Sequence, residues 1–393
     1  MVMSGNSNNS SYKVGMVIDT FDDARNGAVI STQRFTRILR KNGHQVIIFT
    51  TGEPEPDKLI LKEFYPPIPL VKGVMQRMKF TFAWPERQKI ADTLKKIDVL
   101  HNQMPFFLSY RSINMARKAG IPVISTFHVQ AEQIVNNVGL KRHFWVNLVY
   151  KFFIRFIYNQ SDLLICPSQF AADEIKRYGC TTPTVVISNG VTEDYKVLDI
   201  PKTHPDKFVI LTVGRNATEK RQELIIDAIS RSKYKDQILL QIIGDGPLRQ
   251  HLVQKSEELL DGKVEFYYLP PDEVINFYNT ADLYVHAAAV EVECMTALEA
   301  MACGLPLLIA NSELSATKQF AISENNLFTT LEELTQKIEY WYENRDALAR
   351  SREEYLEFVK QYRIEQSYKK LDKAYQTVLQ PKAVEQFSQT ILT

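Results

Sequence analysis

Three glutamates stand close together in the stretch AVEVECMTALEAMACGLPLLIA, which begins at residue 289. Glu291 and Glu299 are eight positions apart, and Glu293 lies between them. Carboxylates are costly to bury, yet the residues that follow Glu299 have the character of a helix core. Paired carboxylates are typical of glycoside hydrolysis, in which they flank the bond that breaks. Two carboxylates on one loop and helix are better placed to bind hydroxyl groups from one side.

The local sequence pattern places Glu291 and Glu299 in different elements. Residues 282–288 read as a strand, 290–295 as a loop, and 296–303 as a helix that ends before Gly304. We therefore expect Glu299 in the first turn of that helix, where the helix dipole favours a carboxylate. Glu291 lies on the loop and has no such structural reason, so a ligand is the better explanation for it.

A second stretch, VGRNATEKRQEL (213–224), carries cations at the end of a strand. Lys220 and Arg221 come at the expected start of a helix, where cations oppose the dipole. An anionic ligand explains them better, and Arg215 with Lys220 would clamp a diphosphate and stabilise it as a leaving group. The alternative is a surface ion pair with Glu219 or Glu223, which is common and contributes little.

Glycines follow four of the apolar runs, at Gly27, Gly190, Gly214 and the pair Gly244 and Gly246. A glycine lets the backbone approach a phosphate, although each of these turns is weak evidence alone. The sequence contains neither GxGxxG nor GxxxxGK[ST], which excludes the dinucleotide fingerprint and the P-loop. Its four cysteines form no CxxC pair and no zinc-like cluster, which favours a reducing compartment.

Apolar runs and helical patterns alternate along the whole chain. Strands are expected at 14–19, 45–50, 98–103, 121–128, 162–168 and 184–190, and again at 208–214, 238–246, 264–269, 282–288 and 305–310. Between the two sets, residues 198–207 have the two prolines and mixed charge of a linker. This order predicts two doubly wound α/β domains, each with a parallel sheet, facing each other across a cleft.

We place the domain boundaries accordingly. Residues 1–11 are expected to be a disordered N-terminus, 12–200 an N-terminal domain and 201–365 a C-terminal domain. A final helix in 366–393 is expected to return to the N-terminal domain before a frayed tail. The first 200 residues hold 25 Lys and Arg against 17 Asp and Glu, while the remainder is acidic. This asymmetry indicates different partners for the two halves, or only compositional drift.

Taken together, these motifs resemble the retaining family-4 glycosyltransferases of the GT-B fold, which have two Rossmann-like domains. The resemblance covers roughly residues 12–380. Its most specific parts are the E-x7-E element of Glu291 and Glu299 followed by AMACGLP, and the GRxxxEK element with Arg215 and Lys220. Other matching segments are NGAVIST (26–32), DVLHNQMPF (98–106), STFH (125–128), ISNGV (187–191) and IIGDGPLR (242–249).

The resemblance implies a role for each matching residue in binding a nucleotide sugar. Glu299 would hold the ribose, Glu291 the transferred sugar, and Arg215 and Lys220 the diphosphate without a metal or other cofactor. Backbone N–H groups of Glu293, Cys294, Met295 and Thr296 would face the sugar and the phosphate. Gly27 and Gly244 would let their loops approach the donor. His128 would lie near the anomeric carbon; its alternative is a strand-end histidine hydrogen-bonded in place.

One segment departs from the family pattern. The family has Glu-Gly-Phe-Gly at the first glutamate, whereas this chain has Glu291, Val292, Glu293 and Cys294. The two glycines that ease backbone approach are absent. Glu293 would add a sugar contact or point to solvent.

The acceptor side of the chain combines basic and aromatic residues. Residues 71–89 contain five Lys or Arg together with Phe80, Phe82 and Trp84. Residues 139–160 contain four Lys or Arg, many aromatic residues and no acidic residue. Such a mixture suits the headgroup region of an anionic membrane, with 71–89 and also 141–158 as candidates. The alternative for 144–158 is a core helix whose basic side chains extend to solvent.

Residues 127–140 also resemble the acceptor-side segment of bacterial diacylglycerol glucosyltransferases in this family. We therefore predict a hexosyltransferase that uses a nucleotide sugar, UDP-linked by expectation, and a diacylglycerol-type lipid or a glycan as acceptor. It would work in the cytoplasm, peripherally on the inner face of the cell membrane, and no nucleic-acid partner is expected. The alternatives are a non-hydrolysing sugar-nucleotide epimerase and an inactive GT-B protein that binds membranes. Sugar, base, acceptor and oligomeric state stay open.

Overall fold

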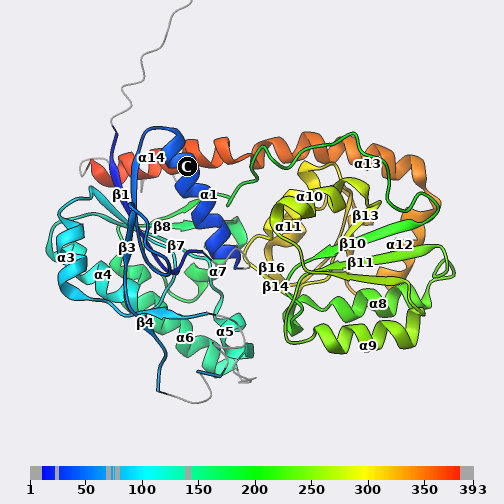
Figure 1. Cartoon of the computed structure of the whole chain (residues 1–393), viewed down its shortest axis with the longest axis horizontal. Coiled ribbons are helices and arrows are strands. Elements are labelled where there is room, and N and C mark those ends of the chain that lie inside the picture. Colours follow the sequence, from blue (N-terminus) through cyan, green and yellow to red (C-terminus); the bar gives the residue numbers. More distant parts are fainter. Residues whose placement is uncertain are drawn as a thin grey trace, which may run out of the picture.

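The computed structural model describes residues 11–22, 26–67, 72–73, 75, 80–137 and 143–380. The predictions for the extreme N-terminus, for most of 71–79, for Lys141 and Arg142, and for the tail from 381 lie outside these residues. Two lobes lie side by side, and each is built around one parallel sheet (Figure 1).

The N-terminal lobe holds a seven-stranded sheet in the order β3-β2-β1-β6-β7-β8-β9, with every pairing parallel. Its strands are β1 (Lys13–Thr20), β2 (Gln45–Thr51), β3 (Lys58–Ile60), β6 (Val99–Asn102), β7 (Val123–Thr126), β8 (Leu163–Cys166) and β9 (Thr184–Val186). The helices are α1 (Gly27–Lys41), α3 (Arg87–Leu94), α4 (Phe107–Lys118), α5 (Ala131–Asn137), α6 (His143–Phe156) and α7 (Gln169–Arg177). A short antiparallel pair, β4 (Glu63–Phe64) and β5 (Phe82–Ala83), lies outside the main sheet.

The C-terminal lobe repeats this plan with six parallel strands in the order β12-β11-β10-β13-β15-β17. Its strands are β10 (Phe208–Val213), β11 (Ile238–Ile243), β12 (Val264–Tyr267), β13 (Leu283–His286), β15 (Leu307–Ala310) and β17 (Leu327–Phe328). The helices are α8 (Gln222–Arg231), α9 (Arg249–Leu260), α10 (Pro271–Thr280), α11 (Met295–Ala302), α12 (Leu331–Glu343) and α13 (Arg345–Phe358). The pair β14 (Val290–Glu291) and β16 (Leu314–Ser315) forms a separate parallel ribbon.

Both sheets are covered by helices on their two faces, which is why their strands read as continuous apolar runs. In the N-terminal lobe, helices α3 to α7 pack on one face. The other face carries α1 and a final helix, α14 (Ile364–Leu379), which runs back from the C-terminal lobe along the top of Figure 1. The prediction of two facing Rossmann-like domains is therefore confirmed.

The expected position of Glu299 in the first turn of its helix was wrong. Helix α11 begins at Met295, so Glu299 is its fifth residue and lies beyond the first turn. The helix starts early because Cys294 takes a left-handed backbone conformation, with φ of +91°, and turns the chain into it. Lys220 and Arg221 do come at the start of a helix, as predicted: Lys220 ends a short 3₁₀ turn, Thr218–Lys220, and Arg221, at φ of +49°, is the N-cap of α8.

Candidate active site

The loops that carry the predicted donor residues follow β10, β11 and β13, at the carboxyl edge of the C-terminal sheet. In open α/β sheets this edge is where ligands bind. The turns after β10 and β11 lie against each other: a Cβ on Gly244 would stand 2.0 Å from the carbonyl oxygen of Gly214. Gly244 also has φ of +145°, so the sequence needs glycine there for packing, independently of any donor contact.

Lys220 and Glu291 meet at the centre of these loops. The Lys220 ammonium forms an ion pair with Glu291 Oε1, and His286 Nε2 lies 3.2 Å from the same oxygen. Burial disfavours the charged carboxylate, but the two cations outweigh it and hold the pKa of Glu291 at about 2. Burial also opposes protonation of His286, but Cys294 and Glu291 raise its pKa to about 9. Glu291 is therefore a buried carboxylate that is ionised at pH 7.

His286 is a residue that the motif analysis missed. It is the last residue of β13 and is 3% exposed, with Nδ1 3.7 Å from the Sγ atom of Cys294. Its position at the carboxyl end of a strand, five residues before Glu291, was the signal available in the sequence. The imidazole joins Glu291 to the thiol and helps to fix the carboxylate.

The same three side chains form the one group of metal-type ligands among the described residues. The ligand atoms of His286, Glu291 and Cys294 lie within 4.8 Å of one another. However, the two ring nitrogens of His286 face different partners, and Lys220 already occupies the carboxylate. The donor set therefore fits an internal charge network better than a bound cation, and catalysis without a metal stays a prediction.

Arg215 lies beside this network but pairs with Glu219 rather than with Glu291. The predicted alternative, an ion pair with a neighbouring glutamate, is thus what the structure shows for Arg215, although not for Lys220. The Arg215 side chain is 32% exposed, so its guanidinium still has donors that face solvent.

Glu299 lies in the buried part of α11, with both carboxylate oxygens already engaged. Oε1 is paired with Arg34 of α1, and Oε2 accepts a hydrogen bond of 3.0 Å from the Tyr278 hydroxyl. Arg34 also donates to the carbonyl oxygen of Gly190 at 2.7 Å. A ribose bound at Glu299 would have to share this carboxylate with Arg34, a partner from the other lobe that the sequence did not reveal.

The segment that departs from the family pattern lies against the N-terminal lobe. Val292 packs on the N-terminal core, and its carbonyl oxygen accepts a 2.6 Å hydrogen bond from Ser168. Glu293 is fully buried, and Oε2 accepts the backbone N–H of Asn189 at 2.8 Å. Of the two alternatives for Glu293, a side chain that points to solvent was therefore wrong, because Glu293 forms a contact between the lobes, and a sugar contact stays a prediction.

Met295 and Thr296 occupy the N-terminal end of α11, whose first N–H groups have no partner within the helix. The Thr296 hydroxyl accepts a hydrogen bond of 2.7 Å from Tyr284. Gly27 approaches from the other lobe: a Cβ there would stand 3.5 Å from the Met295 Cε atom.

His128 lies apart from these groups, at the end of β7. It is 8% exposed, and Nε2 lies 3.1 Å from Gln103 Oε1. Burial lowers the pKa of His128 to about 4, so the ring is neutral at pH 7. The structure thus shows the hydrogen-bonded strand-end histidine of the alternative interpretation, and a role near the anomeric carbon stays a prediction.

Two facing parallel-sheet domains, with cations and carboxylates at the carboxyl edge of the second, define a glycosyltransferase of the GT-B class. Residues 25–195 match the model of Glycosyltransferase Family 4, and residues 197–382 match that of Glycosyl transferases group 1. The chain belongs to the GT-B glycosyltransferases that join these two domains, and it is a hexosyltransferase.

Similar proteins include an alpha-monoglucosyldiacylglycerol synthase of Streptococcus pneumoniae, 26% identical over 75% of this chain and 70% of that protein. A GDP-mannose-dependent alpha-mannosyltransferase of Corynebacterium glutamicum is 24% identical over 75% of this chain and 71% of that protein. Among solved structures, Anabaena HepE in complex with UDP-glucose has a TM-score of 0.75 at 17% identity, covering 93% of this chain and 99% of that chain. This last likeness concerns the fold.

Proposed function

We propose that the protein is a retaining glycosyltransferase that moves a hexose from a UDP-linked donor to a diacylglycerol-type lipid at the cytoplasmic face of a membrane. The part of this proposal that concerns the nucleotide-sugar donor rests on one observation, the buried network of Lys220, Glu291 and His286 at the carboxyl edge of the C-terminal sheet. The acceptor half rests on the similar diacylglycerol glucosyltransferases. No helix among the described residues is both long and apolar enough to cross a bilayer.

In this reaction the bond between the anomeric carbon and the diphosphate oxygen breaks, and a bond to the acceptor oxygen forms on the same face of the sugar. The acceptor hydroxyl gives its proton to the departing phosphate oxygen. Lys220 and Arg215 stabilise the negative charge that develops on the leaving diphosphate. Glu291 accepts hydrogen bonds from sugar hydroxyls, which orients the anomeric carbon towards the acceptor. No protein nucleophile and no metal is required.

A donor screen tests this proposal directly. UDP-glucose, UDP-galactose and GDP-mannose are incubated with the protein, with and without diacylglycerol vesicles, and the products are identified by mass spectrometry. We expect a glycolipid and free UDP only when a UDP-sugar and diacylglycerol are both present. Isomerised donor without acceptor would instead establish an epimerase, and no turnover with any donor would overturn the catalytic assignment.

Site variants connect that activity to the network. Lys220→Ala and Glu291→Ala should each lower kcat by roughly 100-fold to 1,000-fold, because each removes charge aimed at the reacting groups. Lys235→Ala, on the exposed surface of the same lobe, is the matched control and should leave turnover unchanged. Wild-type turnover in Lys220→Ala would refute the site assignment.

A further inference from the structure

Helix α6 presents an apolar stripe to solvent in addition to its core face. Phe144, Leu148 and Phe152 follow one another at helical spacing and are 65%, 48% and 53% exposed. The inward face of the same helix carries Val146, Tyr150, Phe153 and Ile154, which belong to the N-terminal core. The interpretation of 144–158 as a core helix therefore accounts for only half of its apolar residues. A helix that is apolar all round is normally covered on every side.

Basic side chains share this stripe. Lys151 and Arg155 are exposed and continue the line of Leu148 and Phe152 along the helix. No acidic residue occurs between Glu132 and Asp162. The two nearest buried carboxylates are engaged within the lobe, since Glu132 accepts from Tyr150 and Glu174 accepts from Gln130. The stripe therefore offers apolar and positive groups without compensating negative charge.

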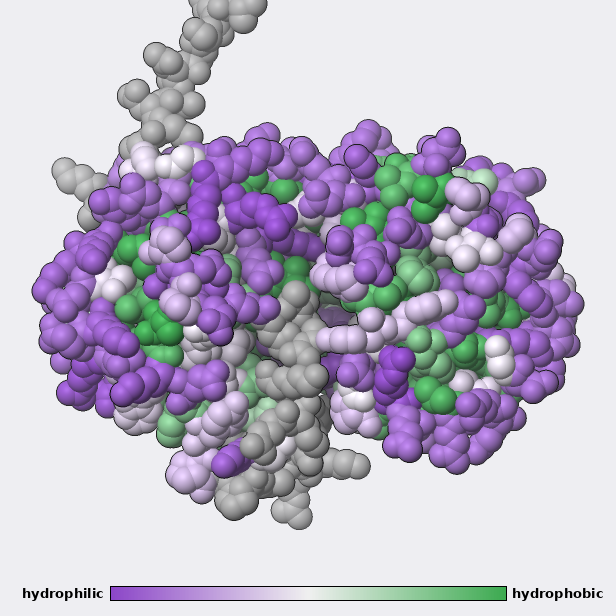
Figure 2. All heavy atoms as spheres, viewed as in Figure 1, coloured by the Kyte–Doolittle hydropathy of each residue, from purple (hydrophilic) through white to green (hydrophobic). Residues whose placement is uncertain are grey.

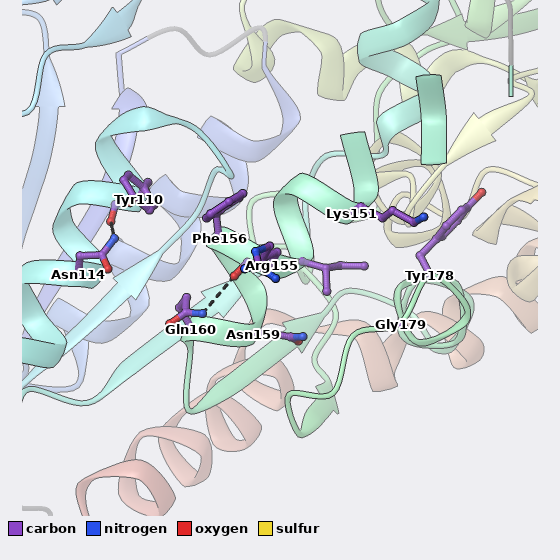
Figure 3. A pocket seen from close by; sticks show the side chains of 10 residues that line it. Tyr110, Asn114, Lys151, Arg155, Phe156, Asn159, Gln160, Tyr178 and Gly179 are labelled. Carbon is purple, nitrogen blue, oxygen red and sulfur yellow. Dashed lines mark hydrogen bonds between the residues drawn. The ribbon is translucent and has the colours of Figure 1, made fainter. Parts of the chain in front are cut away.

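A cavity of about 730 Å³ opens beside the basic end of the stripe (Figure 3). Its lining includes Lys151 and Arg155 from α6, the amides of Asn114 and Asn159, and the rings of Tyr110 and Tyr178. The lining contains no carboxylate. Two cations, amide groups and aromatic rings around an open cavity are suited to a phosphate ester that carries hydroxyl groups.

The apolar stripe of α6 lies close to the start of the cleft between the two lobes. Gln130, immediately before α5, donates a hydrogen bond of 3.2 Å to the carbonyl oxygen of Leu314 in the other lobe. Helices α5 and α6 then follow along the lower edge of the N-terminal lobe in Figure 1. The surface is hollowed where the two lobes meet (Figure 2). A membrane covering α6 would thus lie at the same edge of the lobe as the start of the cleft.

We propose that the outward face of α6 is the docking surface for an anionic phospholipid bilayer, and that the cavity beside it receives one lipid phosphate group. Phe144, Leu148 and Phe152 enter the boundary between headgroups and acyl chains, while Lys151 and Arg155 bind phosphate. The inference rests on the proposed function, in which the acceptor is a lipid. It moves the membrane contact from residues 71–89, of whose five basic residues Arg77 and Lys79 lie outside the described residues, to one helix.

Vesicle sedimentation tests the docking surface. The full chain is mixed with phosphatidylcholine vesicles that contain either no or about one-third phosphatidylglycerol, at low and high salt. We expect binding only to the anionic vesicles, weakened by salt. Lys151→Gln/Arg155→Gln should lower the partition coefficient roughly 30-fold, because each basic residue near an anionic surface contributes about fivefold. Phe144→Ser/Phe152→Ser should lower it more than tenfold, by removing apolar area from the interface.

Matched controls come from the C-terminal lobe. Lys235→Gln/Arg350→Gln removes two exposed cations, and Leu259→Ser/Tyr268→Ser removes two exposed apolar side chains. Both control variants should sediment with vesicles like the wild type. Thermal melting of all four variants establishes that each one is folded.

The two proposals fail in different ways. Equal vesicle binding by the α6 variants and the wild type would overturn the docking surface, even if the enzyme glycosylates diacylglycerol. Vesicle binding that depends on α6, without sugar transfer to any lipid, would uphold the docking surface and overturn the proposed acceptor. Binding to pure phosphatidylcholine as strong as to anionic vesicles would remove the role of Lys151 and Arg155.

Discussion

Glu291 illustrates how a buried carboxylate is kept ionised by its neighbours. Lys220 and His286 both contact Oε1, so the charge of Glu291 is compensated before any donor binds. Cys294 and Glu293 lie in the same loop but differ in what the structure requires of each residue. Cys294 takes a backbone conformation that glycine adopts without strain, and Glu293 bonds to the other lobe.

Replacing Cys294 tests the strain at φ of +91°. A non-glycine residue in this region carries about 1–3 kcal/mol of strain, whereas glycine adds unfolded-state entropy. In Cys294→Gly, the relief of backbone strain and the added entropy of the unfolded state should nearly cancel. We therefore expect a free energy of unfolding within about 1 kcal/mol of the wild type. Cys294→Val should lose about 2 kcal/mol or more, because a β-branched residue tolerates positive φ least. Urea unfolding of both variants measures this, and equal losses would contradict the account.

Glu293 should make folding stability depend on pH. Burial raises the pKa of Glu293 to about 7, above its ordinary value. The contribution of protonated Glu293 to the free energy of unfolding is complete below the unfolded-state pKa of about 4.3. It is lost as the pH rises through 7, because the buried site in the folded state disfavours the ionised carboxylate. Glu293→Gln keeps an acceptor for the Asn189 N–H but cannot ionise. The melting temperature of the variant minus that of the wild type should therefore increase from about pH 5 to about pH 8.

Calorimetry at the two pH values measures that difference. Glu313→Gln, at an exposed position, is the control and should show no such trend. A constant offset between Glu293→Gln and the wild type at both pH values would contradict the burial argument.

The elements that form the site were more predictable than their contacts. Buried parallel strands leave apolar runs, and β10, β11 and β13 lie where such runs occur. The start of α11 was not predictable, because it depends on a positive φ at a cysteine. Arg34 was not predictable either, since its partner is 265 residues away and arises only from the packing of two lobes. Hydrophobic periodicity in a sequence predicts which face of a helix or strand is buried. It does not predict which buried charged side chains form a pair.

Gly244 gives a prediction at the level of the two adjoining turns. In Gly244→Ala the new Cβ would meet the Gly214 carbonyl, so the turns after β10 and β11 must separate. We expect a loss above about 3 kcal/mol in the free energy of unfolding, together with weaker UDP binding. Gly262→Ala also has positive φ but has no atom within 4 Å of the new Cβ, and should lose only about 1 kcal/mol. Urea unfolding and calorimetric titration with UDP distinguish the two variants.

Across the whole molecule, the segments of the candidate site in one lobe are held by side chains and backbone of the other. Arg34 reaches Glu299, Asn189 reaches Glu293, and Ser168 reaches Val292. Bringing the lobes together therefore also shapes the loop that follows Glu291. A donor that requires Glu299 would compete with Arg34, which would couple ribose binding to the contact between lobes.

A double-mutant cycle measures the strength of that contact. Arg34→Gln leaves a buried carboxylate without its cation and should cost about 3–5 kcal/mol. The double variant Arg34→Gln/Glu299→Gln should lose about 0.5–3 kcal/mol less free energy of unfolding than the sum of the losses in the two single variants. The control pair is Arg37 with Asp194, 3.8 Å apart with both side chains more than half exposed, for which we expect coupling near zero. Purely additive losses at Arg34 and Glu299 would show that the buried pair does not link the lobes.

Helix α14 has a consequence for how the protein is made in the cell. Residues Leu371 and Tyr375 complete a core whose other members include residues of β1, α1, β2, β6, β7 and β8, so the first lobe is finished by nearly the last described segment. At a synthesis rate of about 5–20 residues per second, the ribosome needs roughly 10–35 s to pass from the end of β9 to α14. During that interval the nascent chain exposes the apolar patch that α14 later covers. The first lobe to be translated is thus the last to mature, and it is the one expected to need chaperone protection.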